Sequence, residues 1–261
     1  MATRVIDDSK LQDIAVAIQG KDGGGTMTVD QMPTRIAAIP TQDNALLNSL
    51  INRSITSIEN SEVTSIGANA FRKCTNLTSV SLPNVTSIDV STFQDCTNLT
   101  SVSLPNVTSI GANAFYNCNL TSVSLPNVTS IGANAFYNCN LTSVSFPNVT
   151  SIGVSAFYNC NLTSVSLPNV TSIGVSAFQM CTNLSIVILG KRATLPNSNA
   201  FSGTDNAITY VQPEDLSWYS TATNWSALYT AGRVKSIEDL TGDDLIWYQE
   251  QLAKYPIEEA S

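Results

Sequence analysis

Polar and apolar residues in the middle of the chain follow a pattern that returns every 21 or 22 residues. In one unit, residues 120–140, the stretch LTSVSL places Val123 and Leu125 on one side of an extended segment and serines on the other. A period of two predicts a half-buried β-strand. Pro126 and Asn127 then predict a turn, because proline has no N–H with which to continue a ladder.

The rest of the unit predicts a second apolar segment and a short helical turn. Val128 and Ile131 are expected to point inward, and the glycine that follows relieves the bend. The stretch ANAFYNC predicts one helical or 3₁₀ turn, in which Phe136 and Cys139, three residues apart, share the buried side. Tyr137 is then expected to point outward.

Near-identical units predict a stacked solenoid. The stretch TSVSLPNVTSIGANAFYNCNL occupies 100–120 and again 121–141, and a third copy differs only at Phe146, Val154 and Ser155. One unit cannot bury its own apolar side, whereas stacked units bury continuous columns beneath a parallel sheet. Strands are expected to begin near Ile55, Leu77, Leu99, Leu120, Leu141, Leu162 and Leu184, with a last strand at 207–211.

Two residue types mark the predicted buried columns. One phenylalanine per unit is followed three residues later by one cysteine. A fixed phase favours a ladder of buried thiols, since free cysteine behaves as a small hydrophobe. Disulfides or a metal site are the alternatives, although the CxxC spacing of zinc sites is absent. The ladder comprises Phe71, Phe93, Phe115, Phe136, Phe157, Phe178, Cys74, Cys96, Cys118, Cys139, Cys160 and Cys181.

The LxxVxL strand followed by PNVTSIGxxAFxxC resembles the leucine-rich repeats of the BspA-like class, which is found in bacterial surface proteins. The resemblance covers residues 54–203 and implies a leucine-rich-repeat solenoid with a parallel β-sheet and short helical or 3₁₀ turns. The unit from Ile88 departs from the pattern at Asp89 and Thr92, and the unit at Phe201 has lost its cysteine.

The two ends do not repeat. Residues 1–53 predict three short amphipathic helices, which form a helical anchoring and capping module. Residues 204–261 predict a helical C-terminal cap and an acidic helical tail, with a helix over 241–254. The three tryptophans of this end are candidates for a binding patch or, alternatively, for the core of the cap: Trp218, Trp225 and Trp247.

Residues 11–39, LQDIAVAIQGKDGGGTMTVDQMPTRIAAI, look like an N-terminal module of tail-associated proteins of phages and prophages. The resemblance rests on the amphipathic helix, the Gly-rich loop and the TxxQMPxxI run at 28–36. It implies a virion setting, with residues 1–53 binding other virion proteins. Virion appendages are usually oligomeric, so a homo-oligomer is expected.

Charge narrows the function classes. Charged residues make up 12% of the chain, and none lies between Thr97 and Gly190. Ten acidic and three basic residues follow from Asp205 onward, which places −7 of the net charge of −8 there and disfavours nucleic acid as a partner. The sequence has no histidine. We therefore expect no enzyme, cofactor or metal site.

Export and membrane signals are also missing from the sequence. The sequence contains no run of about 18 apolar residues, so no membrane-spanning helix is predicted. The first twenty residues lack the apolar core and the cleavage site of a Sec-type signal peptide. We therefore expect no membrane insertion, and release by phage-induced lysis agrees with the missing signal.

Two rows of outward residues are candidate binding surfaces. A tyrosine row could stack on sugar rings or contact a partner, or be partly buried against the next coil: Tyr116, Tyr137 and Tyr158. A serine row on the sheet could bind glycans or ice, or be a plain solvated face: Ser101, Ser103, Ser122, Ser124, Ser143, Ser145, Ser164 and Ser166. The NLT and NVT triplets match glycosylation sequons at many positions, but we expect their asparagines to form hydrogen-bonded ladders. The turn asparagines are expected to satisfy backbone groups: Asn84, Asn106, Asn127, Asn148 and Asn169.

These features predict a non-enzymatic phage virion protein, exposed on the tail or another surface, whose solenoid contacts a host-surface glycan or protein or neighbouring virion proteins. The alternatives are a bacterial cell-surface adhesin of the BspA-like type and a purely structural scaffold or decoration protein. An enzyme is the remote alternative.

Overall fold

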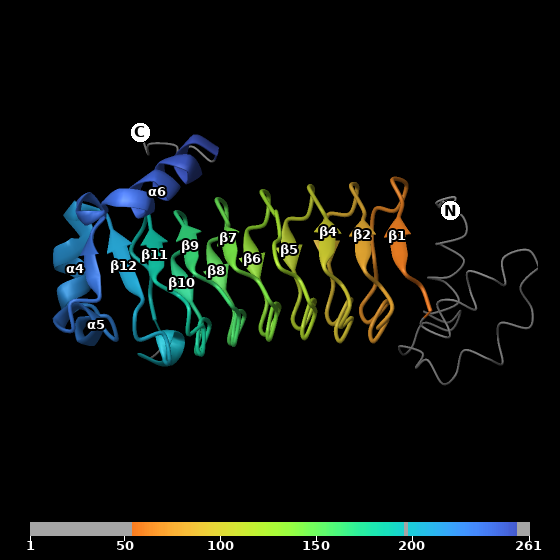
Figure 1. Ribbon diagram of the computed structural model, residues 1–261, viewed down its shortest axis with the longest axis horizontal. Coiled ribbons are helices and arrows are strands. Elements are labelled where there is room, and N and C mark those ends of the chain that lie inside the picture. The colour runs from red at the N-terminus through yellow and green to blue at the C-terminus, as the bar shows by residue number, and fades with distance from the viewer. Residues whose placement is uncertain (1–53, 196–197, 255–261) are drawn as a thin grey trace, which may run out of the picture.

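The structure, a computed structural model, describes residues 54–195 and 198–254. Figure 1 shows coils stacked along one long axis, with β1 near one end and helices α4 and α5 at the other. This confirms the predicted parallel-sheet repeat solenoid. The module predicted for residues 1–53 lies outside the described residues, as does the end of the acidic tail at 255–261.

Where it forms, the first strand of a coil pairs in parallel with the equivalent strand of the next coil, one unit apart. Ser57 pairs with Ser79, and Ser79 pairs with Ser101. These strands form two runs rather than one sheet. The first run contains β1 (Ser57–Glu59), β2 (Ser79–Ser81) and β4 (Ser101–Ser103), and the second contains β7 (Ser143–Ser145), β9 (Ser164–Leu167), β11 (Ile186–Leu189), β12 (Ile208–Val211) and β13 (Val234–Ser236).

The expected strand at 122–124 is missing, and this break separates the two runs. Among the described residues no backbone hydrogen bond joins 101–103 to 122–124. The inward valines beside the break, Val102 and Val123, are only half-buried, whereas Val144 is 3% exposed. The break falls where the segment between the cysteine and the next leucine first becomes one residue shorter, from Cys96–Leu99 to Cys118–Leu120. The segment becomes one residue longer again between β9 and β11, and there the strands still pair.

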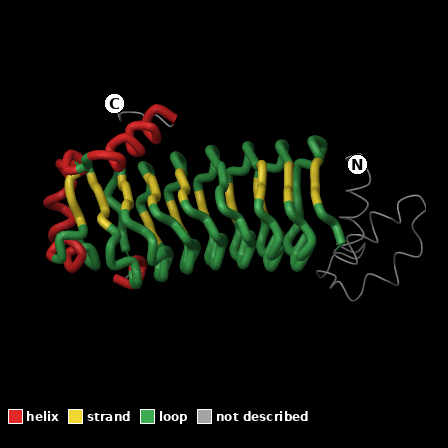
Figure 2. The backbone as a smooth tube through the Cα atoms, in the orientation of Figure 1, coloured by secondary structure: helices red, strands yellow, loops and turns green. Residues whose placement is uncertain are grey.

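A second sheet runs along the coils, and the pattern of the repeat did not predict it. Each of its strands is only two residues long, because the flanking buried residues Val128 and Ile131 lie three apart and the alternation of a strand is not sustained. The sheet contains β3 (Ser87–Ile88), β5 (Ser109–Ile110), β6 (Ser130–Ile131), β8 (Ser151–Ile152) and β10 (Ser172–Ile173). Figure 2 shows how short the strands are against the turns.

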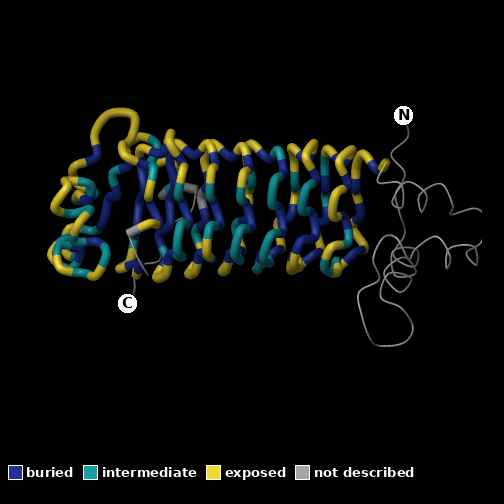
Figure 3. Tube along the Cα trace, turned by 90° about the horizontal axis from the view of Figure 1, so that it is seen from below, coloured by how far each residue is buried: buried dark blue, intermediate teal, exposed yellow. Residues whose placement is uncertain are grey.

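The core between the sheets consists of repeated columns. The phenylalanine rings stack nearly parallel from Phe71 to Phe201, with centroids 5.3–5.5 Å apart. Each thiol from Cys96 to Cys181 donates to the carbonyl of the phenylalanine in the preceding coil at 3.0–3.1 Å. Figure 3 shows the buried strands inside and the exposed corners outside.

Tight backbone turns close each coil. Asn113, Asn117 and their equivalents have positive φ values, a region that asparagine tolerates better than most residues. In the four coils that follow the unit from Ile88, a glycine is required for a different reason: Gly111, Gly132, Gly153 and Gly174. A Cβ on Gly132 would lie 2.6 Å from the backbone nitrogen of Ala112, so only glycine lets neighbouring coils approach this closely.

The C-terminal end replaces the next coil with helices and one extra strand. The chain runs from η2 (Ser198–Phe201) and β12 into a helical segment and returns to pair β13 with β12. The helical elements are η3 (Pro213–Asp215), α4 (Leu216–Thr221), α5 (Ser226–Thr230), η4 (Ile237–Asp239) and α6 (Gly242–Lys254). The helix predicted over 241–254 is thus present. None of the helices in the described ranges could span a bilayer.

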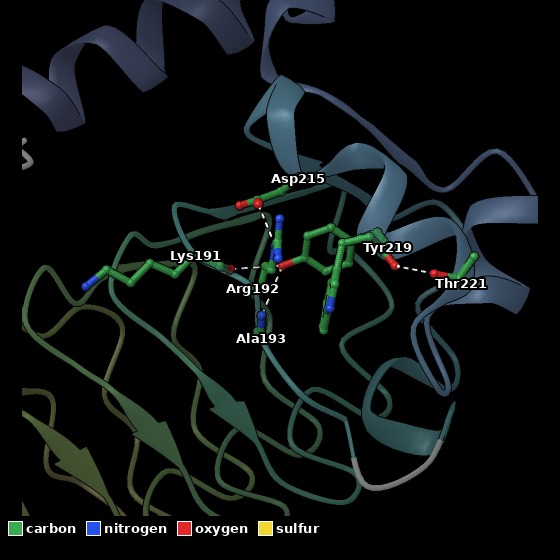
Figure 4. A network of polar contacts seen from close by, with 7 residues as sticks. Lys191, Arg192, Ala193, Asp215, Tyr219 and Thr221 are labelled. Atoms are coloured by element: carbon green, nitrogen blue, oxygen red, sulfur yellow. Dashed lines mark hydrogen bonds and ion pairs between the residues drawn. The ribbon is translucent and has the colours of Figure 1, made fainter. Parts of the chain in front are cut away.

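Aromatic residues close the core at this end. Trp225 is fully buried against Phe201, with ring centroids 5.8 Å apart, and its Nε1 donates to the carbonyl of Ala193 at 2.6 Å. The Tyr219 hydroxyl donates to the Lys191 carbonyl and accepts from the Ala193 amide (Figure 4). These two rings belong to the core of the cap and not to an exposed binding patch.

Candidate binding surface

The predicted tyrosine row lies on the turn side of three central coils. We define the tyrosine–asparagine face by three residue positions in these coils: Tyr116, Tyr137, Tyr158, Asn117, Asn138, Asn159, Asn119, Asn140 and Asn161. The turn ANAFYNC places them there, because the buried phenylalanine and cysteine fix the opposite side. All nine residues are half-buried or exposed.

The three tyrosine rings stack on one another. The centroids of Tyr116 and Tyr137 lie 4.8 Å apart and those of Tyr137 and Tyr158 lie 4.7 Å apart, with interplanar angles of 14° and 3°. Neighbouring rings therefore cover both faces of Tyr137. The predicted stacking of a sugar on the face of each ring is not available at Tyr137, and the row presents ring edges and hydroxyls instead.

The electrostatics of the stack follow from its packing. Burial, and then the neighbouring phenols of Tyr158 and Tyr116, raise the pKa of Tyr137 above its ordinary value. The phenol therefore stays neutral and can donate a hydrogen bond at neutral pH. No hydrogen bond to any of the three phenol oxygens occurs within the described parts of the chain.

Rows of asparagine amides run beside the tyrosines. Asn159 Nδ2 donates to Asn138 Oδ1 at 2.8 Å, and Asn138 donates to Asn117 in the same way. Asn117 donates in turn to the Asp95 carboxylate at 3.3 Å. A parallel row joins Asn161 to Asn140 at 3.1 Å, and Asn140 continues it to the preceding coil.

The row of Asn119, Asn140 and Asn161 lies in the NLT triplets and confirms the asparagine ladder predicted there. The row of Asn117, Asn138 and Asn159 was not singled out from the sequence, although the fixed phase of asparagine in identical units was an available signal. Each amide in a row spends one N–H on its neighbour and keeps a second. The face therefore offers a regular series of donors and acceptors without a charge between residues 97 and 190.

The predicted serine row is exposed in its first part and buried at its C-terminal end. Ser101, Ser103, Ser122, Ser124 and Ser143 are exposed on the sheet. Ser164 and Ser166 are only 8% and 5% exposed, so the expectation that they form an open binding face is wrong. The side chain of Ser145 lies outside the described part of the structure.

The reason lies in the next strands, where the outward residues become apolar. In β11 the outward positions hold Ile186 and Ile188, which cluster with Tyr210, Leu240 and side chains of α6 that include Trp247. Figure 1 shows α6 along the upper edge of the solenoid, above β12, β11 and β9. The helix thus covers the sheet face at this end and leaves Trp247 half-buried.

The thiol ladder has a structural position. All six cysteines are buried and free of disulfides. Burial raises the pKa of Cys96, Cys139 and Cys181 to about 12, which keeps these thiols protonated and poorly nucleophilic at neutral pH. Across the described ranges, no group of three or more acidic, cysteine or histidine residues is arranged to hold a metal ion.

The turn asparagines hold the corners of the coils, as predicted. Asn106 Nδ2 donates to the Pro83 carbonyl at 2.7 Å, and Asn127 donates to the Pro105 carbonyl at 2.8 Å. Asn84, Asn148 and Asn169 make the equivalent bonds to the preceding coil. These amides satisfy turn carbonyls, whereas those of the tyrosine–asparagine face pair with one another.

At the C-terminal end, the exposed Arg192 side chain lies against the half-buried Trp218 ring. The Arg192 guanidinium carbon lies 5.8 Å from the centroid of the half-exposed Trp218 ring. Arg192 Nε also donates to the Asp215 carboxylate at 2.7 Å (Figure 4). Arginine is therefore already engaged on both sides and fixes the loop after β11 to α4.

Known proteins place this architecture in a family. Six copies of the "BspA type Leucine rich repeat region" match residues 42–110 and 108–222. A leucine-rich-repeat protein of T. pallidum is 28% identical with a TM-score of 0.50, over 56% of this chain and 72% of that one. No curated protein matches the chain.

Further solved structures are more distant. A leucine-rich cell-surface protein of Faecalibacterium prausnitzii is 20% identical with a TM-score of 0.34, over 79% of this chain and 83% of that one. A leucine-rich-repeat protein of Bacteroides ovatus is 23% identical with a TM-score of 0.27, over 61% of each chain. None of these comparisons supports a phage tail-like N-terminal module. The repeat matches, which span most of the sequence, show that the chain belongs to the family of BspA-type leucine-rich-repeat proteins.

Proposed function

We propose that this chain is a non-enzymatic binding protein of the bacterial cell surface, and that its solenoid serves adhesion. The family supports this, since BspA-like repeats are found in bacterial surface proteins. The observation that carries the proposal is the tyrosine–asparagine face. It repeats one arrangement of phenols and amides over three coils and carries no charge of its own.

The chemistry of this face favours binding over catalysis. Its phenols and amides can donate and accept hydrogen bonds, but none is a base near neutral pH. Contacts that are weak in one coil recur in the next, so a ligand that spans several coils gains affinity through avidity. Adhesion requires this kind of summed contact.

Localisation provides the first test. A producing culture is separated into washed envelopes, supernatant and phage-sized particles on a density gradient, and the chain is quantified in each by mass spectrometry. Surface exposure is then measured by protease treatment of intact cells. We expect enrichment in envelopes and loss after protease treatment.

The competing virion role rests on the N-terminal resemblance alone. Enrichment in particles, in fixed ratio to the major capsid protein, would overturn the proposal in favour of that role. Binding is measured separately, by retention of the fluorescently labelled full chain on whole cells. A chain that is surface-exposed but retained by no cell type would be a structural scaffold.

A further inference from the structure

We infer that the tyrosine–asparagine face binds an uncharged, hydroxyl-rich linear polymer, a neutral polysaccharide, which lies along the solenoid axis. This inference rests on the proposed function and names its ligand class. It follows from three properties of the face: its period, its neutrality and the groups that its rows leave unpaired.

The first property is the repetition of the same side chains along the solenoid axis at a fixed spacing. Tyr116, Tyr137 and Tyr158 repeat at 4.7–4.8 Å with nearly parallel rings, and the amides of Asn117, Asn138 and Asn159 repeat with them. A contact made at one coil is thus offered again one coil further along. A polymer of identical sugar units can use every copy, whereas a peptide of mixed sequence matches one copy at most.

The second property is neutrality, over a tyrosine–asparagine pattern that ends on both sides. In the tyrosine row, the positions before Tyr116 hold Arg72 and Gln94, and the position after Tyr158 holds Gln179. In the row beside it, Lys73 and Asp95 precede the asparagines, and the exposed Met180 follows. The tyrosine–asparagine pattern therefore has a defined length of three coils and lies within the uncharged tract. Binding there should depend little on salt, since no ion pair is involved.

The third property is the set of unpaired groups. The phenol oxygens of the three tyrosines make no hydrogen bond to the described residues, and each amide of the row keeps one N–H. Because the rings cover one another, a sugar meets their edges and hydroxyls. Recognition is therefore by hydrogen bonds to sugar hydroxyls along the row, and not by stacking on a ring face.

The sheet face is a poorer candidate for a long ligand. Its exposed serines end at the buried Ser164 and Ser166, and its backbone ladder is broken at 122–124. The tyrosine stack and the amide row cross that same region without interruption. The turn side is thus the continuous surface of the central coils.

The test is retention of the purified full chain on cellulose and chitin, with chondroitin sulfate and polygalacturonate as charged comparators, at 50 and 500 mM NaCl. We expect retention on a neutral polymer that changes less than twofold with salt. Chitin and cellulose separate an N-acetylated amino-sugar polymer, as in microbial envelopes, from a plain glucan. Retention on the charged polymers alone, lost in high salt, would overturn the inference.

Variants locate the site. Replacing Tyr116, Tyr137 and Tyr158 by phenylalanine keeps the stack and removes three hydroxyls, and we expect about tenfold or greater weakening from three lost hydrogen bonds. Tyr137→Ala should weaken binding similarly by opening the stack. The matched control, Ser122→Ala on the exposed sheet face of the same region, should bind as the wild type does. Circular dichroism and burial of the thiols check the fold of each variant.

Oligosaccharides of increasing length test the periodic match. Affinity should rise with each added sugar until the ligand spans Tyr116 to Tyr158 and then level off. Unchanged affinity in the triple phenylalanine variant would overturn the assignment to this face. Retention of the wild type on whole cells but on none of the polysaccharides would overturn the ligand class and leave the proposed adhesion intact. Failure to bind cells would instead count against adhesion itself.

Discussion

The three central coils and the C-terminal cap differ in how their buried carbonyls, rings and polar groups obtain partners. Every central coil finds an identical neighbour, so its carbonyls, rings and amides are satisfied by translation, as in the bond from Cys139 to the Phe115 carbonyl. The cap has no further coil beside it. It therefore supplies unlike side chains to the positions that another coil would occupy.

Two substitutions in the cap show this. Thr204, fully buried, stands in the thiol column three residues after Phe201, and its hydroxyl donates to the carbonyl of that phenylalanine at 2.6 Å. Arg233 then donates to the carbonyls of Thr204 and Ala207 from the segment that follows α5. A repeat can thus be ended by side-chain donors, but each one must be placed individually.

The largest change in the free energy of unfolding is expected at alkaline pH. It arises from the buried thiols, which lie in the coils and not in the cap. Burial raises the pKa of Cys96, Cys139 and Cys181 from 9.0 to about 12. Because the folded state favours the protonated thiol, its stabilisation is complete below pH 9 and is lost as the pH rises from 9 to 12. Each such thiol should lower the free energy of unfolding by about 1.4 kcal/mol per pH unit in this window.

Urea unfolding at pH 7, 9 and 10.5 measures this effect. Cys139→Ala should have a shallower pH dependence than the wild type, since one buried thiol is missing. A wild-type midpoint that does not move above pH 9 would contradict the account.

The next effect is expected from Trp225→Ala, which removes the ring that closes the phenylalanine column. We expect a loss of about 3–5 kcal/mol, as for other large buried aromatics. Because repeat proteins are stabilised by nearest neighbours, the damage should be local to the end. Alkylation followed by mass spectrometry should find Cys181 labelled faster than Cys118. Equal labelling of both would show that cap and coils unfold as one unit.

Ser166→Glu sharpens the contrast on the sheet, because the same serine row is covered by α6 at one end and open in the middle. A carboxylate at this buried position should cost about 2 kcal/mol or more or displace α6. Limited trypsin cleavage at Lys235 should then accelerate. Ser122→Glu, at an exposed position, should leave the cleavage rate and the melting temperature nearly unchanged.

The smallest effect is expected from Asn138, which combines a left-handed φ of 57° with two amide bonds. Asn138→Ala should lose about 1–2 kcal/mol, since alanine adopts this φ poorly and makes no row. Asn138→Gly should lose less, because glycine accepts the backbone. Equal melting temperatures for the two variants would show that the amide row, and not the backbone, dominates at this position.

The sequence alone was sufficient for the solenoid, because identical units can only be satisfied by identical neighbours. A period of two within LTSVSL and the shared phase of Phe136 and Cys139 predicted a strand, a turn and one buried side per coil, and only the strand at 122–124 does not form. The uncharged tract from 97 to 190 is likewise a property of the linear sequence. These features are local or repeat at a fixed spacing, so a linear pattern contains them.

Only the tertiary structure decided which surfaces stay open. That α6 packs on Ile186 and Ile188, that Ser164 and Ser166 are buried, and that the rings of Tyr116 and Tyr137 cover each other depend on contacts between coils or distant segments. The break of the sheet at 122–124 is also visible only in the structure. Near-identical sequences around Ser122 and Ser164 gave no sign of their different exposure. The physical reason is that burial is a property of neighbours in space, and those neighbours lie many residues away in the chain.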